Sequence, residues 1–126
     1  MRIVVANSGE PIYRQIERQV VRAVLGGELR DGDPLPSIRQ LARDLRVSVI
    51  TTTRAYTELE QRGFITTVPG KGCFAKAPDP GEVRNQLRGD VAAHLREAVA
   101  AGRLAAMPMA DLVDLLRDLF QEDDHA

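Results

Sequence analysis

The first regular pattern along the chain is a repeat of apolar residues at every fourth position across residues 11–25. Its members are Ile12, Ile16, Val20 and Val24. This spacing places all four on one face of an α-helix, and Pro11 is suited to the first position of that helix. Gly26 and Gly27 end the pattern, and the turn-rich residues 27–36 that follow, with their Asp-Gly pair and two prolines, cannot continue a helix.

Two short capped helices are predicted next. Ser37 and Gln40 have the spacing of a capping box, and the helix that they open ends near Arg46. Ser48 caps a second helix over residues 49–62, which Gly63 closes. The apolar positions of the two helices are Ile38, Leu41, Ala42 and Leu45, then Ala55, Tyr56 and Leu59, with Thr52 able to turn inward. Two such helices joined by about three residues are typical of a helix-turn-helix, although other helical hairpins share this pattern.

A β-hairpin is predicted directly after these helices. Residues 64–68 and 73–74 are strand formers, and the sequence Pro-Gly-Lys-Gly between them predicts a turn with a basic tip. A hairpin in this position is called a wing. We therefore expect residues 1–77 to form a winged helix-turn-helix domain that binds DNA.

The remaining residues, 78–126, predict a tail of two helices. Asp79, Pro80 and Glu82 form a helix start, and an apolar face continues to about Ala101, where Gly102 is expected to end the helix. A last helix opens near Pro108, and the polar residues 121–126 are expected to fray. The expected fold class is mainly α with a small β-hairpin, a winged helix-turn-helix followed by a short two-helix dimerisation element.

Charge divides the chain at the same place. The whole chain has a net charge of −1, but residues 1–77 have twelve basic and eight acidic side chains, while residues 78–126 have five and ten. A polyanion would therefore meet the first part, and the second part suits protein contacts or simple solvation.

Other classes of chemistry find little support in the sequence. Cys73 is the single cysteine, His94 and His125 stand outside any ligand set, and we expect no metal and no cofactor. No catalytic triad, phosphate loop or isolated carboxylate pair is present, so we do not expect an enzyme. The start has no signal-peptide design and no apolar run reaches membrane-spanning length, which favours the cytoplasm and no membrane partner.

Across residues 11–75 the sequence resembles the GntR family of bacterial regulators. The residues that carry the resemblance are Pro11-Ile12-Tyr13, Leu35-Pro36-Ser37-Ile38-Arg39-Gln40-Leu41-Ala42, Val47-Ser48, Thr51, Arg54-Ala55-Tyr56, Leu59-Glu60, Gly63-Phe64-Ile65 and Gly70-Lys71-Gly72. The short tail is similar to that of the YtrA-like subfamily, in which it is a small dimerisation element. About 50 residues leave no room for the metabolite-binding domain of larger relatives.

The resemblance implies roles for individual residues. Arg39 matches an arginine that reaches DNA from the first helix of the motif, and the wing tip Gly70, Lys71 and Gly72 is implied to touch the minor groove or its phosphates. The expected contacts on the second helix, called the recognition helix, are Ser48, Val49, Ile50, Thr51, Thr53 and Arg54. Many relatives have Arg or Pro and then Asn where this chain has Val49 and Ile50, which can make only apolar contacts, for instance with a thymine methyl group. Arg54 can equally brace the fold through an acidic neighbour, and Tyr56 is expected in the core.

The expected function is that of a transcription regulator, a repressor that binds a palindromic double-stranded operator as a homodimer. One recognition helix reads only about four or five base pairs, so two copies are needed for useful affinity. The residues expected to pack against a second copy are Val83, Leu87, Val91, Leu95, Leu112, Leu115, Leu116 and Leu119. Folding of these residues back onto the first domain is an alternative, as is a winged helix that binds proteins and never DNA. An unidentified small-molecule effector would bind at the tail interface or between tail and wing.

Overall fold

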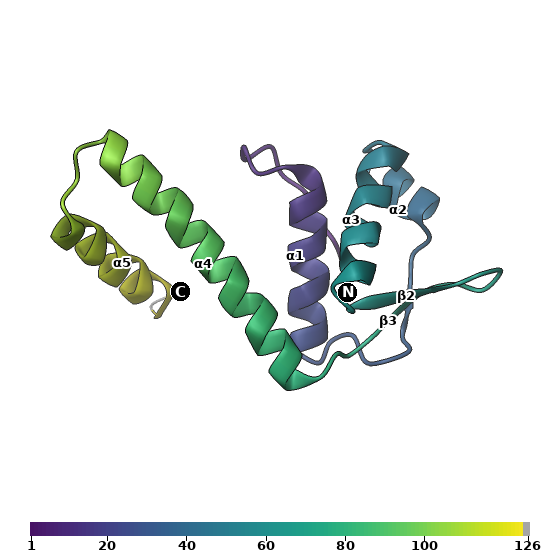
Figure 1. The fold of residues 1–126 in the computed structure, drawn as a ribbon. Coiled ribbons are helices and arrows are strands. Elements are labelled where there is room, and N and C mark those ends of the chain that lie inside the picture. Colours follow the sequence, from purple (N-terminus) through teal and green to yellow (C-terminus); the bar gives the residue numbers. More distant parts are fainter. Residues whose placement is uncertain (125–126) are drawn as a thin grey trace. The chain divides into compact units, whose positions relative to one another are not determined.

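The computed structural model describes residues 1–124 and divides the chain into two compact units, Met1–Pro80 and Gly81–Ala126. In chain order the first unit contains α1 (Ile12–Leu25), β1 (Pro34–Leu35), α2 (Ile38–Leu45), α3 (Val49–Gln61), β2 (Ile65–Val68) and β3 (Gly72–Ala75) (Figure 1). The second consists of α4 (Pro80–Leu104), which starts at the boundary, and α5 (Met109–Asp124). The expected mainly helical fold with a small antiparallel β-structure is confirmed.

The core of the first unit lies among α1, α2, α3 and the sheet. Its helical part comes from the apolar stripes that the sequence shows, with Ile16, Val20 and Leu59 fully buried. Phe64 and Ile65 extend the core from the end of α3 into β2, and both are at most 1% exposed. Burial of one such large side chain stabilises a fold by about 1.5–3 kcal/mol, so these few residues hold the three helices together.

The sheet has a third strand that the sequence analysis missed. Its strand order is β1-β3-β2, all antiparallel, with Leu35 opposite Cys73 and Cys73 opposite Thr67. β1 is only two residues long and includes a proline, so it carries no periodic signal, and Pro34 is tolerated because β1 is an edge strand. The hairpin turns at Pro69 and Gly70, where Gly70 has φ +76° and the Lys71 N–H donates to the Val68 carbonyl at 2.9 Å, as in a type II turn.

The N-terminal segment is fastened to α1 by two glutamine side chains. The Gln15 amide bonds both backbone groups of Ala6 at 2.8 Å, and the Gln19 amide bonds the Val4 N–H at 3.0 Å and the Val4 carbonyl at 2.6 Å. Four helical residues rise about 6 Å and two extended residues about 6.6 Å, so the two side chains match alternate residues of the segment. The side chains thus act as a partner strand for the segment.

The second unit corrects two expectations. Gly102 does not end α4, which continues to Leu104. The helix stops through a Schellman motif around Ala106, at φ 56°, in which the Met107 N–H donates to the Gly102 carbonyl at 2.8 Å. Gly102 serves close packing instead, since a Cβ atom there would lie 3.0 Å from Leu112 Cδ2.

The expected fraying of residues 121–126 is wrong for its first four residues, because α5 continues to Asp124. An apolar stripe at Leu112, Leu116 and Leu119 extends the helical pattern up to the polar end. His125 and Ala126 lie outside the described residues.

The glutamine bonds give a first prediction. Gln15 is 3% exposed, and its amide also donates to the Glu10 carbonyl at 2.9 Å. The Gln15→Ala change should lower the free energy of unfolding by about 1–3 kcal/mol, because it removes three part-buried hydrogen bonds to the backbone of Ala6 and Glu10. Urea denaturation followed by circular dichroism measures this loss. Gln61→Ala, at an exposed position of α3, is the matched control and should change stability by less than about 0.5 kcal/mol. Equal losses would contradict the role of Gln15.

Candidate nucleic-acid interface

The geometry of the helix pair α2 and α3 is set by its caps and by the turn between them. The Ser37 hydroxyl accepts the Gln40 N–H at 3.1 Å and so starts α2. Arg46 ends α2 in the left-handed conformation at φ 56°, and the Val47 N–H donates to the Ala42 carbonyl at 3.0 Å. Ser48 then starts α3 by accepting the Thr51 N–H at 3.1 Å. Every step of the predicted helix–turn–helix is therefore fixed by a local hydrogen bond.

Two side-chain hydrogen bonds fasten α3 to α2 and to the segment before it. Thr52 is fully buried, and its hydroxyl lies 3.2 Å from the Ile38 carbonyl and 3.0 Å from the Val49 carbonyl. The Tyr56 hydroxyl donates to the Pro36 carbonyl at 2.7 Å, and burial raises the pKa of Tyr56. Tyr56 is thus a core residue, as expected, and the side of α3 that carries Thr52 and Tyr56 faces inward.

The opposite side of α3 is exposed. Ile50 is 82% exposed and Val49 is 47% exposed, although both are large and apolar. Thr53 and Thr57 are exposed as well, and with Ile50 they follow the i, i+3, i+7 spacing of a single helical face. Thr57, which the sequence analysis did not name, extends this exposed face by one turn.

The structure brings two predicted contact residues together across the turn. Arg39 of α2 and Val49 of α3 line one open hollow of about 520 Å³, together with Ala42, Arg43 and Val47. Arg43, which is one of the lining residues, and Arg46 are both exposed. The result is an exposed surface that combines apolar side chains with guanidinium groups. We call this set, Arg39, Arg43, Val49, Ile50 and Thr53, the reading surface.

The wing tip is a separate exposed element. Gly70, Lys71 and Gly72 are exposed, and the β2–β3 loop projects beyond the helices of the first unit (Figure 1). Both glycines have positive φ, +76° and +116°, so the turn depends on their conformational freedom. Cys73 follows the tip, is buried, and has its sulfur 3.6 Å from the Thr67 hydroxyl.

Arg54 is engaged within the fold. Its guanidinium lies over the Tyr13 ring at 3.9 Å from the centroid, and its Nε lies 3.7 Å from a Glu58 carboxylate oxygen. Both contacts connect α3 with α1 or stabilise α3 itself. The structure thus shows the bracing arrangement that the sequence left open for this arginine.

A buried ion pair braces the end of α3. The Arg62 guanidinium lies 2.6 Å from Glu17 Oε1 of α1, and the Glu17 side chain is only 7% exposed. Burial raises the pKa of Glu17, and a hydrogen bond with Glu58 acts in the same direction, while Arg62 opposes both. Sequence patterns could not reveal this pair, because its partners are 45 residues apart.

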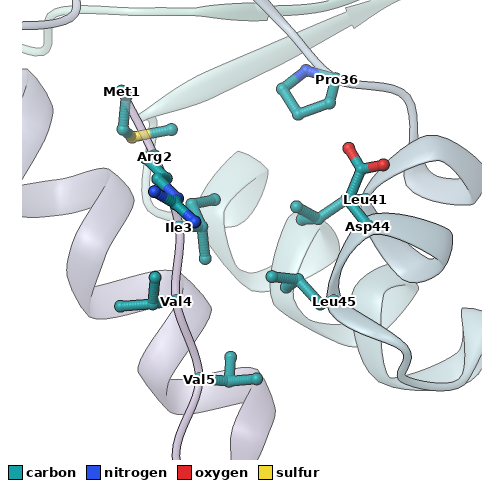
Figure 2. A pocket seen from close by; sticks show the side chains of 9 residues that line it. All are labelled: Met1, Arg2, Ile3, Val4, Val5, Pro36, Leu41, Asp44 and Leu45. Atoms are coloured by element: carbon teal, nitrogen blue, oxygen red, sulfur yellow. The ribbon is translucent and has the colours of Figure 1, made fainter.

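A second hollow, of about 530 Å³, lies between the N-terminal segment and α2. Figure 2 shows Leu41 and Leu45 of α2 pointing toward the side where Ile3, Val4 and Val5 lie. Arg2 and Asp44 add one charge of each sign to its lining. The hollow is therefore amphipathic.

Within residues 1–124 no group of three His, Cys, Asp or Glu side chains is arranged to hold a metal ion. The helices in this part of the chain are all too short or too polar to cross a membrane.

The three-stranded sheet, the capped helix pair and the exposed hairpin define a winged helix-turn-helix protein. Residues 12–75 match the gntR family of bacterial regulatory proteins, and the chain belongs to this family. The predicted resemblance is therefore confirmed.

Individual relatives agree with this assignment. The chain is 42% identical over 67 residues to the HTH-type transcriptional repressor YtrA of Bacillus subtilis, of which it spans 52%. It is 32% identical over 109 residues to the HTH-type transcriptional regulator Rv1152 of Mycobacterium tuberculosis, covering 86% of this chain and 85% of that protein. The solved structure of YtrA from Sulfolobus acidocaldarius, a GntR-family transcription factor, superposes with a TM-score of 0.55 at 31% identity, covering 94% of this chain and 96% of the other. These relatives are named as transcription regulators, not as enzymes.

The buried carboxyl group of Glu17 gives a prediction about pH. The pKa of Glu17 is raised above its ordinary value of 4.5 in the folded chain, so as pH rises past that value the unfolded chain releases its proton first. Protonated Glu17 therefore stabilises the fold at pH values below its ordinary pKa, and this contribution is lost as pH rises through the pKa of Glu17 in the folded chain. Relative to Glu17→Gln, the wild-type free energy of unfolding should fall over this range. Urea titrations at a series of pH values measure the free energy of unfolding of both proteins. If the wild type instead gained stability relative to Glu17→Gln as pH rises, the ion pair with Arg62 would outweigh the effect of burial on Glu17.

Proposed function

We propose that this chain is a transcription repressor that acts in the cytoplasm by binding a palindromic operator as a homodimer. The observation that carries the proposal is the reading surface: a helix start at which Val49 lines a hollow with Arg39 and Arg43 and Ile50 is 82% exposed, on a helix whose other side is buried. A protruding helix with cations at its base matches the major groove, which admits an α-helix between two rows of phosphates. Occupation of the operator would then block transcription.

The start of α3 and its flanking groups supply the phosphate contacts of this proposal. Free N–H groups and the partial positive charge at a helix N-terminus favour a phosphate oxygen. The Ser48 and Thr51 hydroxyls, 2.8 Å apart, lie at that start and can add a bond to the same oxygen. Arg39 reaches from α2 with a guanidinium that suits a phosphate or a guanine. Arg54, held by Tyr13 and Glu58, orients α3 in this scheme.

The wing supplies a second contact. Lys71 at its tip is exposed, and its flanking glycines have no side chain that would keep the backbone away from DNA. We assign Lys71 and its neighbours Gly70 and Gly72 to the minor groove or its phosphates. A lysine there acts as a point charge and adds affinity independent of sequence.

The second unit supplies the dimer contact. Several large apolar side chains of α4 and α5 are exposed in the single chain. Their exposed fractions are 55% for Val91, 47% for Leu95, 50% for Leu115, 44% for Leu116 and 57% for Leu119. Contiguous exposed apolar residues of this kind mark interaction sites. Phe120, 67% exposed, extends the face beyond the residues expected from the sequence. Leu87 and Leu112 are half-buried, whereas Val83 is 6% exposed and has little surface left for a partner.

A second copy of the chain would cover this apolar face. It would also supply the second recognition helix that a palindromic operator with two half-sites requires. Two-fold symmetry would place two recognition helices on successive major grooves, about 34 Å apart, which a palindromic operator requires. For a small-molecule effector, the first unit offers the amphipathic hollow between the N-terminal segment and α2 (Figure 2).

A winged helix that binds only proteins is the competing function, and the exposed apolar residues of α3 favour it. Binding to DNA separates the two functions. The repressor should bind a selected palindromic duplex with an affinity that falls steeply with salt, whereas a protein-binding module would select no duplex.

The wing contact predicts a change in salt dependence. Lys71→Ala should weaken binding to all duplexes alike and should flatten the slope of log affinity against log salt by about one unit, because one phosphate contact is lost. Fluorescence anisotropy at several salt concentrations measures both. Lys76→Ala is the matched control, since Lys76 is also exposed but lies at the base of the hairpin, and its slope should stay close to that of the wild type. Equal effects of the two variants would argue against a contact at the wing tip.

The dimer face predicts the effect of a charge on α5. Leu119→Glu should convert a dimer into a monomer at micromolar concentration, because a buried carboxylate at the interface would lack a partner. Light scattering coupled to gel filtration measures the mass. Leu104→Glu is the control, since Leu104 is 92% exposed but lies outside the proposed interface, and this variant should stay dimeric. A monomeric wild-type chain would refute the dimer.

A further inference from the structure

The polar side chains at the start of α3 are already engaged. The Ser48 hydroxyl accepts the Thr51 N–H and lies 2.8 Å from the Thr51 hydroxyl. Thr52 is fully buried, with its hydroxyl against the Ile38 and Val49 carbonyls. These groups shape the helix end and can reach phosphates, but they do not extend toward a base edge.

The single arginine of α3's first two turns also has partners within the fold, although its side chain is 58% exposed. Arg54 lies over the Tyr13 ring at 3.9 Å and near Glu58 at 3.7 Å. To grip a guanine it would have to give up both contacts. The side chains that protrude from the first turn without an internal partner are therefore Val49 and Ile50, at 47% and 82% exposure.

The surroundings of these two apolar side chains fit DNA. Val49 lines the open hollow of about 520 Å³ together with the apolar residues Ala42 and Val47 and the charged residues Arg39 and Arg43. An apolar pair beside two guanidinium groups is complementary to an apolar group that lies between phosphates. In the major groove of DNA, the thymine C5-methyl is the group of this kind, and the other three bases lack it.

We propose that Val49 and Ile50 read thymine methyl groups, so that the chain selects its operator by apolar contact rather than by gripping guanine. This proposal rests on the proposed function, because it requires α3 to enter the major groove. Burial of one methyl group corresponds to about a fourfold change in affinity. The same contact makes binding sensitive to C5 methylation of cytosine, since 5-methylcytosine presents its methyl at the same place in the groove.

The test removes the methyl group alone. Duplexes that the full-length chain selects from a random library are resynthesised with deoxyuridine in place of each thymidine in turn, and affinity is measured for the wild type and for the double variant Val49→Ala/Ile50→Ala. At one or more positions of each half-site, the wild type should lose about fourfold in affinity. The double variant should show no loss at those positions, because the coupled change isolates the contact between the two groups.

Two controls sharpen the comparison. Leu25→Ala removes an equally exposed leucine, 47%, from the end of α1 and should retain the full deoxyuridine penalty. Replacing a sensitive thymine by cytosine should weaken wild-type binding, and 5-methylcytosine at that position should restore about fourfold of the affinity. Thermal unfolding of the double variant should match the wild type, because neither side chain is part of the core.

Deoxyuridine duplexes that bind the wild type as tightly as thymidine duplexes at every position would overturn the proposal and leave DNA binding intact. An unchanged penalty in the double variant would likewise overturn it, because another group would then read the methyl. Failure to select any duplex would refute the proposed function itself.

Discussion

The first unit depends on the way α3 is held from one side only. α1 packs along it, the Thr52 hydroxyl ties it to the Ile38 carbonyl of α2, and the Tyr56 hydroxyl ties it to the Pro36 carbonyl. Buried polar groups of this kind are costly unless they are paired, so each bond fixes both the depth and the rotation of the helix. Because the inward side is specified so strictly, the outward side is specified too, and Val49 and Ile50 are left in solvent as a consequence.

The elements that the sequence predicted are those whose determinants are local. Ser37 and Ser48 start their helices with a bond to a residue three positions on, and Gly63 ends α3 at φ +85°, so pattern and caps together placed both helices to within one residue. The errors have non-local causes. β1 exists only because Leu35 lies opposite Cys73, and the N-terminal segment is held by side chains up to 15 residues away. Gly102 has the sequence signature of a helix end, but its lack of a side chain serves the approach of Leu112.

The candidate site also divides into features with local causes, which the sequence predicted, and features with non-local causes, which it did not. Exposure of Ile50, Thr53 and Lys71 follows from their positions relative to buried stripes and turns, and the sequence located all three. The engagement of Arg54 does not follow from its neighbours in the chain, because its partner Tyr13 belongs to another helix. Arg62 and Glu17 form their pair for a similar reason, through the packing of α3 on α1. Local chemistry thus predicts which residues face outward, whereas tertiary contacts decide which of them are free.

The residues of α3 that stabilise the fold are different from the residues that it exposes, and this has an evolutionary consequence. The helix is stabilised by the buried residues Thr52, Ala55, Tyr56 and Leu59, whereas Val49 and Ile50 are not part of the core. Surface positions of this kind typically tolerate substitution at a cost of less than about 0.5 kcal/mol. After gene duplication, a paralogue could therefore acquire new residues at these two positions without passing through an unstable intermediate, and under the proposed function such a change would also alter its target.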